Sequence, residues 1–178
     1  MKVLHNNLIG KVLGTCKLET LIGQGGMSAV FLAQQPHLSR HVAVKVLLPD
    51  VLMDSSLYQE FITRFQREAH VIAQLEHINI MPIYDYGEQD GITYLVMPYL
   101  TGGSLRDILS RRRVLSLPEA LPYIDQAAAA LDYAHARGVI HRDLKPGISY
   151  FILMDGSSSP ILVSLASCKP IVMPSEPR

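Results

Sequence analysis

The chain has 178 residues, of which 48% are hydrophobic and 18% are charged. This composition is typical of a globular chain with a buried core and argues against a disordered protein. Lysine plus arginine and aspartate plus glutamate number 16 each. The chain therefore has no net positive charge, which argues against nucleic acid as a partner. Cys16 and Cys168 have no CxxC spacing, which argues against a disulfide framework or zinc site and favours the cytoplasm. We expect no membrane segment, because no apolar run reaches the roughly 18 residues that a span needs.

The first half of the chain predicts a small sheet with one helix. Short β-branched and apolar runs alternate there with glycine, proline and polar turns. Leu57 to Leu75 carries apolar residues at helical spacing, which predicts an amphipathic helix. The predicted strands are Cys16 to Ile22, Ala29 to Gln34, Val42 to Leu47, Ile80 to Tyr86 and Ile92 to Met97.

The pattern changes to helices after the turn at Thr101 to Gly103. Helices are predicted at Ser104 to Arg112 and at Pro118 to Arg137, where a proline suits the first turn and a glycine follows the end. Arg111 to Arg113 suggest either a phosphate-binding patch or a solvated helix end that complements the dipole, and we favour the helix end. A β-rich part therefore precedes an α-rich part, which indicates an α+β fold.

A glycine-rich segment joins the first two predicted strands. Glycines let backbone N–H groups approach phosphate oxygens closely and allow the positive φ of a tight turn. A strand follows, which argues against a dinucleotide-binding fingerprint, and the Gly-Lys-Ser/Thr ending of a Walker loop is missing. Alone, the segment fits an ordinary hairpin equally well. Its residues are Ile22, Gly23, Gln24, Gly25, Gly26, Met27, Ser28, Ala29 and Val30.

Two further segments carry chemistry. Lys45 lies on the buried-looking strand that follows the glycine-rich hairpin, where it can reach phosphate oxygens. Glu68 on the predicted helix is its candidate ionic partner. Val139 to Gly147 contains the run His-Arg-Asp-Leu-Lys-Pro. In it, Asp143 can accept the proton of an attacking hydroxyl, and Lys145 can neutralise charge on a transferring phosphoryl group.

Together these segments resemble the eukaryotic-type serine/threonine protein kinases of bacteria, from Thr15 to Gly147. The resemblance implies a bilobal fold, with a five-stranded N-lobe carrying one helix and an incomplete helical C-lobe. It also implies ATP as the phosphoryl donor, Mg²⁺ in the intact family, and a protein substrate with serine or threonine. The implied catalytic residues are Asp143 as base, Lys145, and the Lys45–Glu68 ion pair. Lys145 is what marks a serine/threonine rather than a tyrosine kinase.

The resemblance also assigns the ATP contacts. Gly23, Gly25 and Gly26 cover the phosphates, and Ser28 stands where a third glycine is common. Met97 is the gatekeeper before the hinge, and Pro98 departs from the usual acidic residue but keeps its carbonyl acceptor. The remaining implied contacts are Ile22, Gln24, Met27, Val30, Ala43, Lys45 and Leu100.

The resemblance divides the chain into four parts. These are a lead-in (1–14), the N-lobe (15–97), the hinge and partial C-lobe (98–147), and a tail (148–178) with no family pattern, which we expect to be disordered. The family places a magnesium-holding asparagine at the position of Ile148 and the aspartate of an Asp-Phe-Gly triplet at that of Ile161. We therefore predict no metal ligands in this chain and negligible kinase activity.

A shifted reading frame explains the tail. Codons for Ile148 to Ala166 can be chosen so that one base added after the Gly147 codon gives N-I-L-F-H-P-D-G-W-L-L-L-T-D-F-G-I-A. Both missing magnesium ligands then return at the family spacing. We therefore hypothesise a deleted base near codon 147. Two alternatives to an active kinase stay open: a nucleotide-binding pseudokinase module, and a translated fragment without a function of its own.

Overall fold

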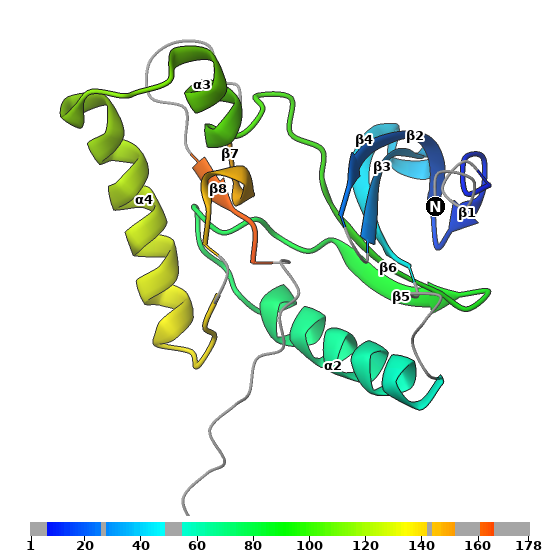
Figure 1. Ribbon diagram of the computed structural model, residues 1–178. Helices are drawn as coiled ribbons and strands as arrows, with labels where there is room; N and C mark the ends of the chain where they lie inside the picture. Colours follow the sequence, from blue (N-terminus) through cyan, green and yellow to red (C-terminus); the bar gives the residue numbers. More distant parts are fainter. Residues whose placement is uncertain (1–6, 26–27, 49–54, 142–143, 152–160, 166–178) are drawn as a thin grey trace, which may run out of the picture. The chain divides into compact units, whose positions relative to one another are not determined.

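The structure of the chain is a computed structural model, which describes residues 7–25, 28–48, 55–141, 144–151 and 161–165 (Figure 1). The chain divides into two compact units. The first comprises Met1–Ala69 and Ile83–Tyr99, and the second comprises His70–Pro82 and Leu100–Arg178. The first unit is built on a sheet and the second mainly on helices, so the predicted α+β class is confirmed.

A six-stranded antiparallel sheet forms the first unit, in the order β1-β2-β3-β4-β6-β5. Four of the five predicted strands are confirmed with slightly longer bounds. A 3-10 turn, η1 (Pro36–Leu38), connects β3 to β4. The strands of this sheet are β1 (Val12–Leu13), β2 (Cys16–Gln24), β3 (Ser28–Gln35), β4 (Arg40–Leu47), β5 (Asp85–Gln89) and β6 (Ile92–Pro98).

Residues 7–14 belong to the sheet unit, contrary to the prediction that residues 1–14 are a separate lead-in. Leu8 and Leu13 are buried in the core, and β1 adds a strand to the expected five. The Gln89 side chain accepts a hydrogen bond from the Gly14 N–H at 2.9 Å and donates one to the Val12 carbonyl at 3.0 Å. These bonds tie the turn after β1 to the end of β5, which the sequence pattern did not indicate.

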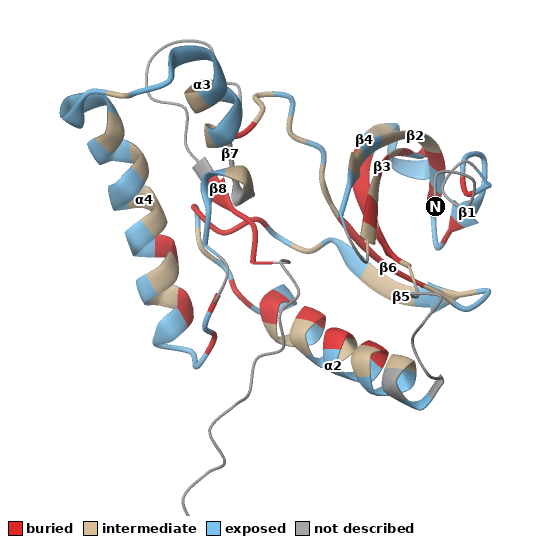
Figure 2. Ribbon diagram, in the orientation of Figure 1, coloured by how far each residue is buried: buried red, intermediate tan, exposed pale blue. Residues whose placement is uncertain are grey.

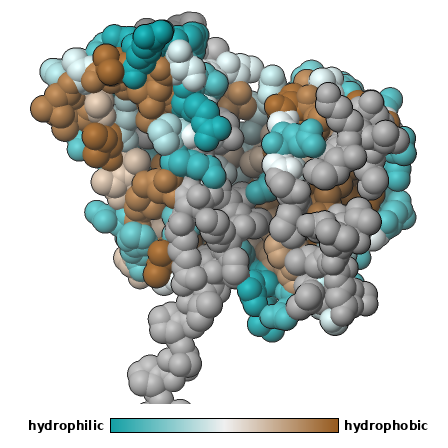
Figure 3. All heavy atoms as spheres, in the orientation of Figure 1, coloured by the Kyte–Doolittle hydropathy of each residue, from teal (hydrophilic) through white to brown (hydrophobic). Residues whose placement is uncertain are grey.

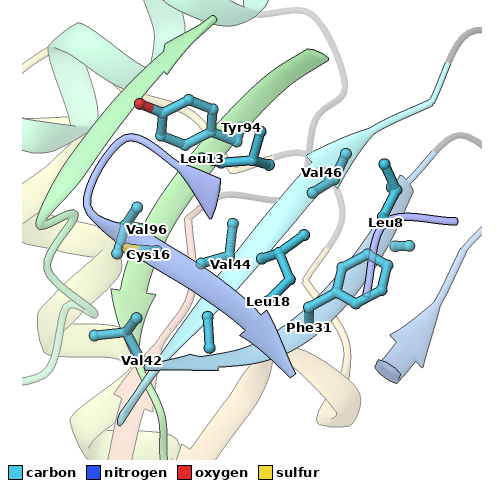
Figure 4. Close-up of a cluster of buried hydrophobic side chains, with 12 residues drawn as sticks. Leu8, Leu13, Cys16, Leu18, Phe31, Val42, Val44, Val46, Tyr94 and Val96 are labelled. Carbon is cyan, nitrogen blue, oxygen red and sulfur yellow. The ribbon is translucent and has the colours of Figure 1, made fainter. Parts of the chain in front are cut away.

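One face of the sheet carries the core of the first unit. Successive side chains of a strand point to opposite faces, so alternate residues of β3, β4 and β6 meet on one side. Figure 4 shows these side chains packed together. Burial raises the pKa of the Cys16 thiol, so this cysteine is a protonated core residue. The cluster consists of Leu8, Leu13, Cys16, Leu18, Ala29, Phe31, Ala33, Val42, Val44, Val46, Tyr94 and Val96.

The predicted amphipathic helix is confirmed as α2 (Ser55–Ala73). Its buried residues are Ile62, Phe65, Ala69 and Ile72, which recur at three- and four-residue steps. Figure 2 shows them along one side of the helix. The periodicity therefore identified both the helix and its buried face.

Residues 70–82 belong to the second unit, although the sequence placed them within the N-lobe. The predicted strand Ile80 to Tyr86 is wrong, because Ile80 forms only an isolated bridge with Val163 and β5 begins at Asp85. Asn79 donates a side-chain hydrogen bond to Gln126 at 2.9 Å. The His77 and Tyr133 rings lie 5.0 Å apart. These contacts bind the segment to the helical unit.

Two capped helices begin the second unit, α3 (Leu105–Arg112) and α4 (Leu117–His135). Ser104 and Ser116 each form a capping box, with Asp107 and Glu119 respectively, which explains where both helices start. Arg112 forms an ion pair with Glu119 at 2.6 Å. This contact is consistent with the interpretation of the three arginines as a helix end. In the described part of the chain, no helix is long and apolar enough to span a membrane.

One side of α4 exposes apolar residues. Leu121 and Ile124 are 44% and 57% exposed, and Ala128 is exposed as well. Leu117 continues this stripe toward the start of the helix, and Figure 3 shows the apolar surface over α4. Leu131, on the same helix, is partly buried.

The tail contributes ordered strands to the second unit. After η2 (Pro146–Ile148), β7 (Ser149–Phe151) pairs antiparallel with β8 (Ile161–Val163). The Val163 N–H donates to the Asn79 carbonyl at 2.8 Å, and the Met81 N–H donates to the Val163 carbonyl at 3.0 Å. The prediction of disorder for residues 148–178 is therefore wrong for these strands, since backbone hydrogen bonds hold them to the preceding chain.

Candidate active site

The glycine-rich segment forms the hairpin between β2 and β3. Gly23 is opposite Val30, and the Gly25 N–H donates to the Ser28 carbonyl at 2.8 Å. Neither Gly23 nor Gly25 has a positive φ, so the expected left-handed turn is not found at these two positions. A Cβ at Gly25 would lie 3.3 Å from the Ser28 Oγ, so this turn leaves little room for a side chain. Gly26 and Met27 lie outside the described residues.

The residues predicted to contact ATP from the strands share one face of the sheet. Lys45 is opposite Val30 on β3 and opposite Leu95 on β6, while Ala43 is opposite Met97. Directly paired residues point to the same side, so these five side chains lie on the face away from the core cluster. Gly23, opposite Val30, extends the row to β2. A cation, small side chains and the glycine hairpin thus meet on one surface.

Helix α2 lies over the same face. Tyr58 in its first turns is next to Thr93 of β6, which shares the face of Leu95 and Met97 by alternation. Glu68 is on α2 and is half-buried, as is Lys45 on β4. The structure therefore brings the helix that carries Glu68 to the sheet face that carries Lys45. The ion pair itself stays a prediction.

The predicted hinge follows β6. Met97 and Pro98 are the last residues of that strand, and Pro98 is opposite Val42. Leu100 is half-buried and belongs to the second unit. Ile22 and Gln24, also predicted contacts, are exposed near the end of β2. Their contacts to ATP remain predictions.

The catalytic segment lies in the second unit, but Asp143 lies outside the described residues. Lys145 is exposed just before η2. His141 is buried, and its Nε2 is 2.9 Å from the carbonyl oxygen of Ser164. This bond supports a structural role for His141, and it joins the catalytic segment to the residue after β8.

The two positions predicted for magnesium ligands in the family carry isoleucine. Ile148 ends η2, and Ile161 begins β8 opposite Phe151. Alkyl side chains offer no oxygen or nitrogen to a metal, so these residues do not fit Mg²⁺. Within the described ranges, no group of three His, Cys, Asp or Glu side chains is placed to hold a metal ion.

Comparison with known families decides what this arrangement is. The family model of the protein kinase domain matches residues 16–157. This chain belongs to the protein kinase family. The match extends ten residues beyond Gly147, where the sequence resemblance was expected to end, and it agrees with the ordered β7 strand.

The curated relatives are bacterial serine/threonine-protein kinases. PrkC of Bacillus subtilis is 42% identical over 140 residues, which cover 78% of this chain and 21% of PrkC. PknJ of Mycobacterium tuberculosis is 37% identical over 160 residues, covering 90% of this chain and 26% of PknJ. The chain therefore spans about a fifth to a quarter of the length of these two relatives.

Solved structures give the same family. The kinase domain of Mycobacterium tuberculosis PknI matches with a TM-score of 0.74 and 33% identity, covering 95% of this chain and 64% of that domain. A second crystal structure of the PknI kinase domain matches with a TM-score of 0.73 and 33% identity, covering 95% of this chain and 62% of that one. The predicted kinase-like fold is confirmed.

The sequence did not indicate Leu32 and Leu95, which also lie on the sheet face that carries Lys45. Leu32 lies opposite Ala43, and Leu95 lies opposite Lys45. Period-two alternation along β3 points to Leu32 once Val30 is assigned. Leu95 depends on the register between β4 and β6, which the sequence pattern alone does not fix.

Proposed function

We propose that the domain represented by this chain transfers a phosphoryl group from ATP to serine or threonine hydroxyls of proteins. The observation that carries the proposal is the face on which Lys45, Val30, Ala43 and Met97 lie beside the glycine hairpin. These residues fit ATP, because a cation suits phosphates, glycines let the backbone come close to them, and small apolar side chains suit a flat base.

Each residue has one proposed task. Lys45 holds phosphate oxygens and Glu68 keeps the lysine in place. Asp143 accepts the proton of the substrate hydroxyl, and Lys145 neutralises negative charge on the phosphoryl group in transit. ATP, when bound, supplies that group. The protein substrate lies over the segment that contains Asp143 and Lys145.

We propose that a polypeptide with this amino-acid sequence has negligible transferase activity. Ile148 and Ile161 do not fit the metal that the family requires, and phosphoryl transfer depends on positioning and charge neutralisation more than on covalent chemistry. A deleted base near codon 147 is the proposed cause. Coding DNA whose codons are incompatible with the shifted reading N-I-L-F-H-P-D-G-W-L-L-L-T-D-F-G-I-A contradicts this explanation.

One purified sample distinguishes the two alternatives, a nucleotide-binding module and a fragment without function. The purified chain is titrated with ATP, with and without Mg²⁺, and then assayed for transfer to a serine peptide. ATP binding that does not depend on Mg²⁺, without transfer, supports the nucleotide-binding module. Transfer to the peptide overturns the proposed inactivity. Failure to obtain a soluble, folded species supports the fragment without function.

The proposed location is the cytoplasm. Its support is the cysteine usage, since neither Cys16 nor Cys168 has the spacing of a disulfide framework. Fractionation of the native host with antibody against this chain tests the proposal, and recovery outside the cytoplasmic fraction contradicts it.

A further inference from the structure

The side chain of Arg106 in α3 lies against the backbone of Gly147. A Cβ built on Gly147 would be 2.9 Å from both Cζ and Nη2 of Arg106 and 3.0 Å from Nε. Three atoms of one planar group are thus almost equally far from one point, so the guanidinium lies flat over Gly147. α3 also contacts η2 and β7, which hold Gly147 and the strand after it (Figure 1).

Arg106 keeps its donors available. The residue is exposed and makes no side-chain hydrogen bond within the described part of the chain, while its charge helps to lower the pKa of the adjacent Asp107 carboxylate. The neighbouring carboxylate of Asp107 is occupied, since it accepts hydrogen bonds from the N–H and hydroxyl of Ser104, both at 2.7 Å. The contact with Gly147 therefore restricts the guanidinium without using its N–H groups, which is the state of a preorganised anion-binding group.

The position of Gly147 brings this cation close to the predicted reaction centre. Consecutive Cα atoms are about 3.8 Å apart, so the Gly147 Cα is at most about 8 Å from that of Lys145 and about 15 Å from that of Asp143. An extended peptide rises by about 3.3 Å per residue. A substrate whose hydroxyl is at Asp143 can therefore place a side chain two to four residues away over Arg106.

We propose that Arg106 is a specificity-determining residue that selects protein substrates with a carboxylate two to four residues from the phosphorylated serine or threonine. This inference rests on the proposed kinase function. It requires glycine at position 147, because any side chain there displaces the guanidinium.

The test measures peptide binding by the full chain, which does not depend on its catalytic activity. Two fluorescent serine peptides differ only in carrying glutamates or glutamines at the two to four positions on either side of the serine. We expect the acidic peptide to bind about three to ten times more tightly, with a preference that falls as salt rises. Arg106→Gln should remove the preference, and Gly147→Ala should weaken it.

Arg111→Gln is the matched control. Arg111 is exposed on the same helix, and its Nε donates to the Asp107 carbonyl at 3.2 Å, so it lacks the contact with Gly147. We expect this variant to keep the preference. Equal binding of the two peptides by the unaltered chain overturns the inference, and so does an equal effect of Arg106→Gln on both peptides, which indicates packing alone. Circular dichroism checks that each variant is folded.

ATP binding, measured on the same samples, separates this inference from the proposed function. ATP binding without any preference for the acidic peptide overturns the role of Arg106 and leaves the kinase proposal standing. A preference that Arg106→Gln removes, in a chain that does not bind ATP, supports the role of Arg106 and counts against nucleotide binding. No binding of either peptide overturns the role of Arg106 in this chain.

Discussion

Lys45 of β4 and Val30 of β3 are directly opposite each other in the antiparallel sheet, and Val30 is in turn opposite Gly23. The cation and the glycine hairpin are therefore two strands apart on the same face. Neighbouring strands are about 4.8 Å apart, so the two features can contact one phosphate chain. The other face is filled by the core cluster, so a ligand of Lys45 is expected on this face, beside α2.

Lys45→Met is expected to weaken ATP binding at least tenfold. A hydrogen bond to a charged group is worth about 1.5–3 kcal/mol, and about 1.4 kcal/mol corresponds to a factor of ten. Calorimetric titration measures the effect. Lys17→Met is the matched control, because Lys17 is exposed on β2 and is opposite Gln34. Equal losses in the two variants contradict a specific role for Lys45.

How much the sequence predicted depended on the range of the interactions involved. The helix α2 and its buried face followed from local periodicity, because a helix repeats within the segment itself. The start of α4, predicted at Pro118 and found at Leu117, followed from a proline in its first turn. The glycine hairpin and the role of Lys45 could be predicted because each depends on a short motif of neighbouring residues.

Long-range pairing was the part that failed. Ile80 looked like a strand residue, but its bridge partner, Val163, lies in a segment that was expected to be disordered. The attachment of β1 depends on Gln89, far along the chain. Such contacts are specified by tertiary packing and not by local pattern, so propensity does not reveal them. The face of Lys45 became clear only with the strand register.

His141→Ala is expected to loosen β8. His141 is buried and its Nε2 is 2.9 Å from the Ser164 carbonyl oxygen, so its loss leaves that oxygen without this partner. An unsatisfied buried group costs about 1–3 kcal/mol, which corresponds to a fall of about five- to 150-fold in hydrogen-exchange protection of the Val163 amide. Hydrogen exchange with mass spectrometry measures it.

The control for this prediction is His135→Ala. His135 is the exposed last residue of α4, and its replacement should leave the protection of Val163 unchanged. Exchange of the Val163 amide in the unaltered chain at the rate of an unstructured peptide contradicts the pairing of β8 with Asn79. It also restores the expectation of a disordered tail.

Thr93→Val is expected to stabilise the first unit. The hydroxyls of Thr93 and Tyr58 are buried next to each other, and neither meets the geometry of a hydrogen bond with any described residue. Removal of an unpartnered buried hydroxyl at nearly constant volume should raise the free energy of unfolding by about 1 kcal/mol. Urea denaturation measures the change. Thr93→Ser keeps the hydroxyl and loses a methyl group, so it should destabilise, and a stabilising effect of Val and Ser alike contradicts the explanation.

Glu119 is expected to make the stability of α4 depend on pH below about 5. Hydrogen bonds from the Ser116 hydroxyl and N–H, together with the Arg112 guanidinium, lower the pKa of Glu119 from 4.5 to about 2. A lowered folded-state pKa means that the ionised form stabilises the folded chain, so this contribution is full above the unfolded value and disappears as pH falls toward 2. Thermal melts of the chain and of Glu119→Gln, compared from pH 6 to pH 2, should therefore differ most at pH 6 and converge at low pH. Asp125→Asn, an exposed carboxylate change on the same helix, is the control, and a difference between the chain and Glu119→Gln that stays constant down to pH 2 contradicts the capping role of the Glu119 carboxylate.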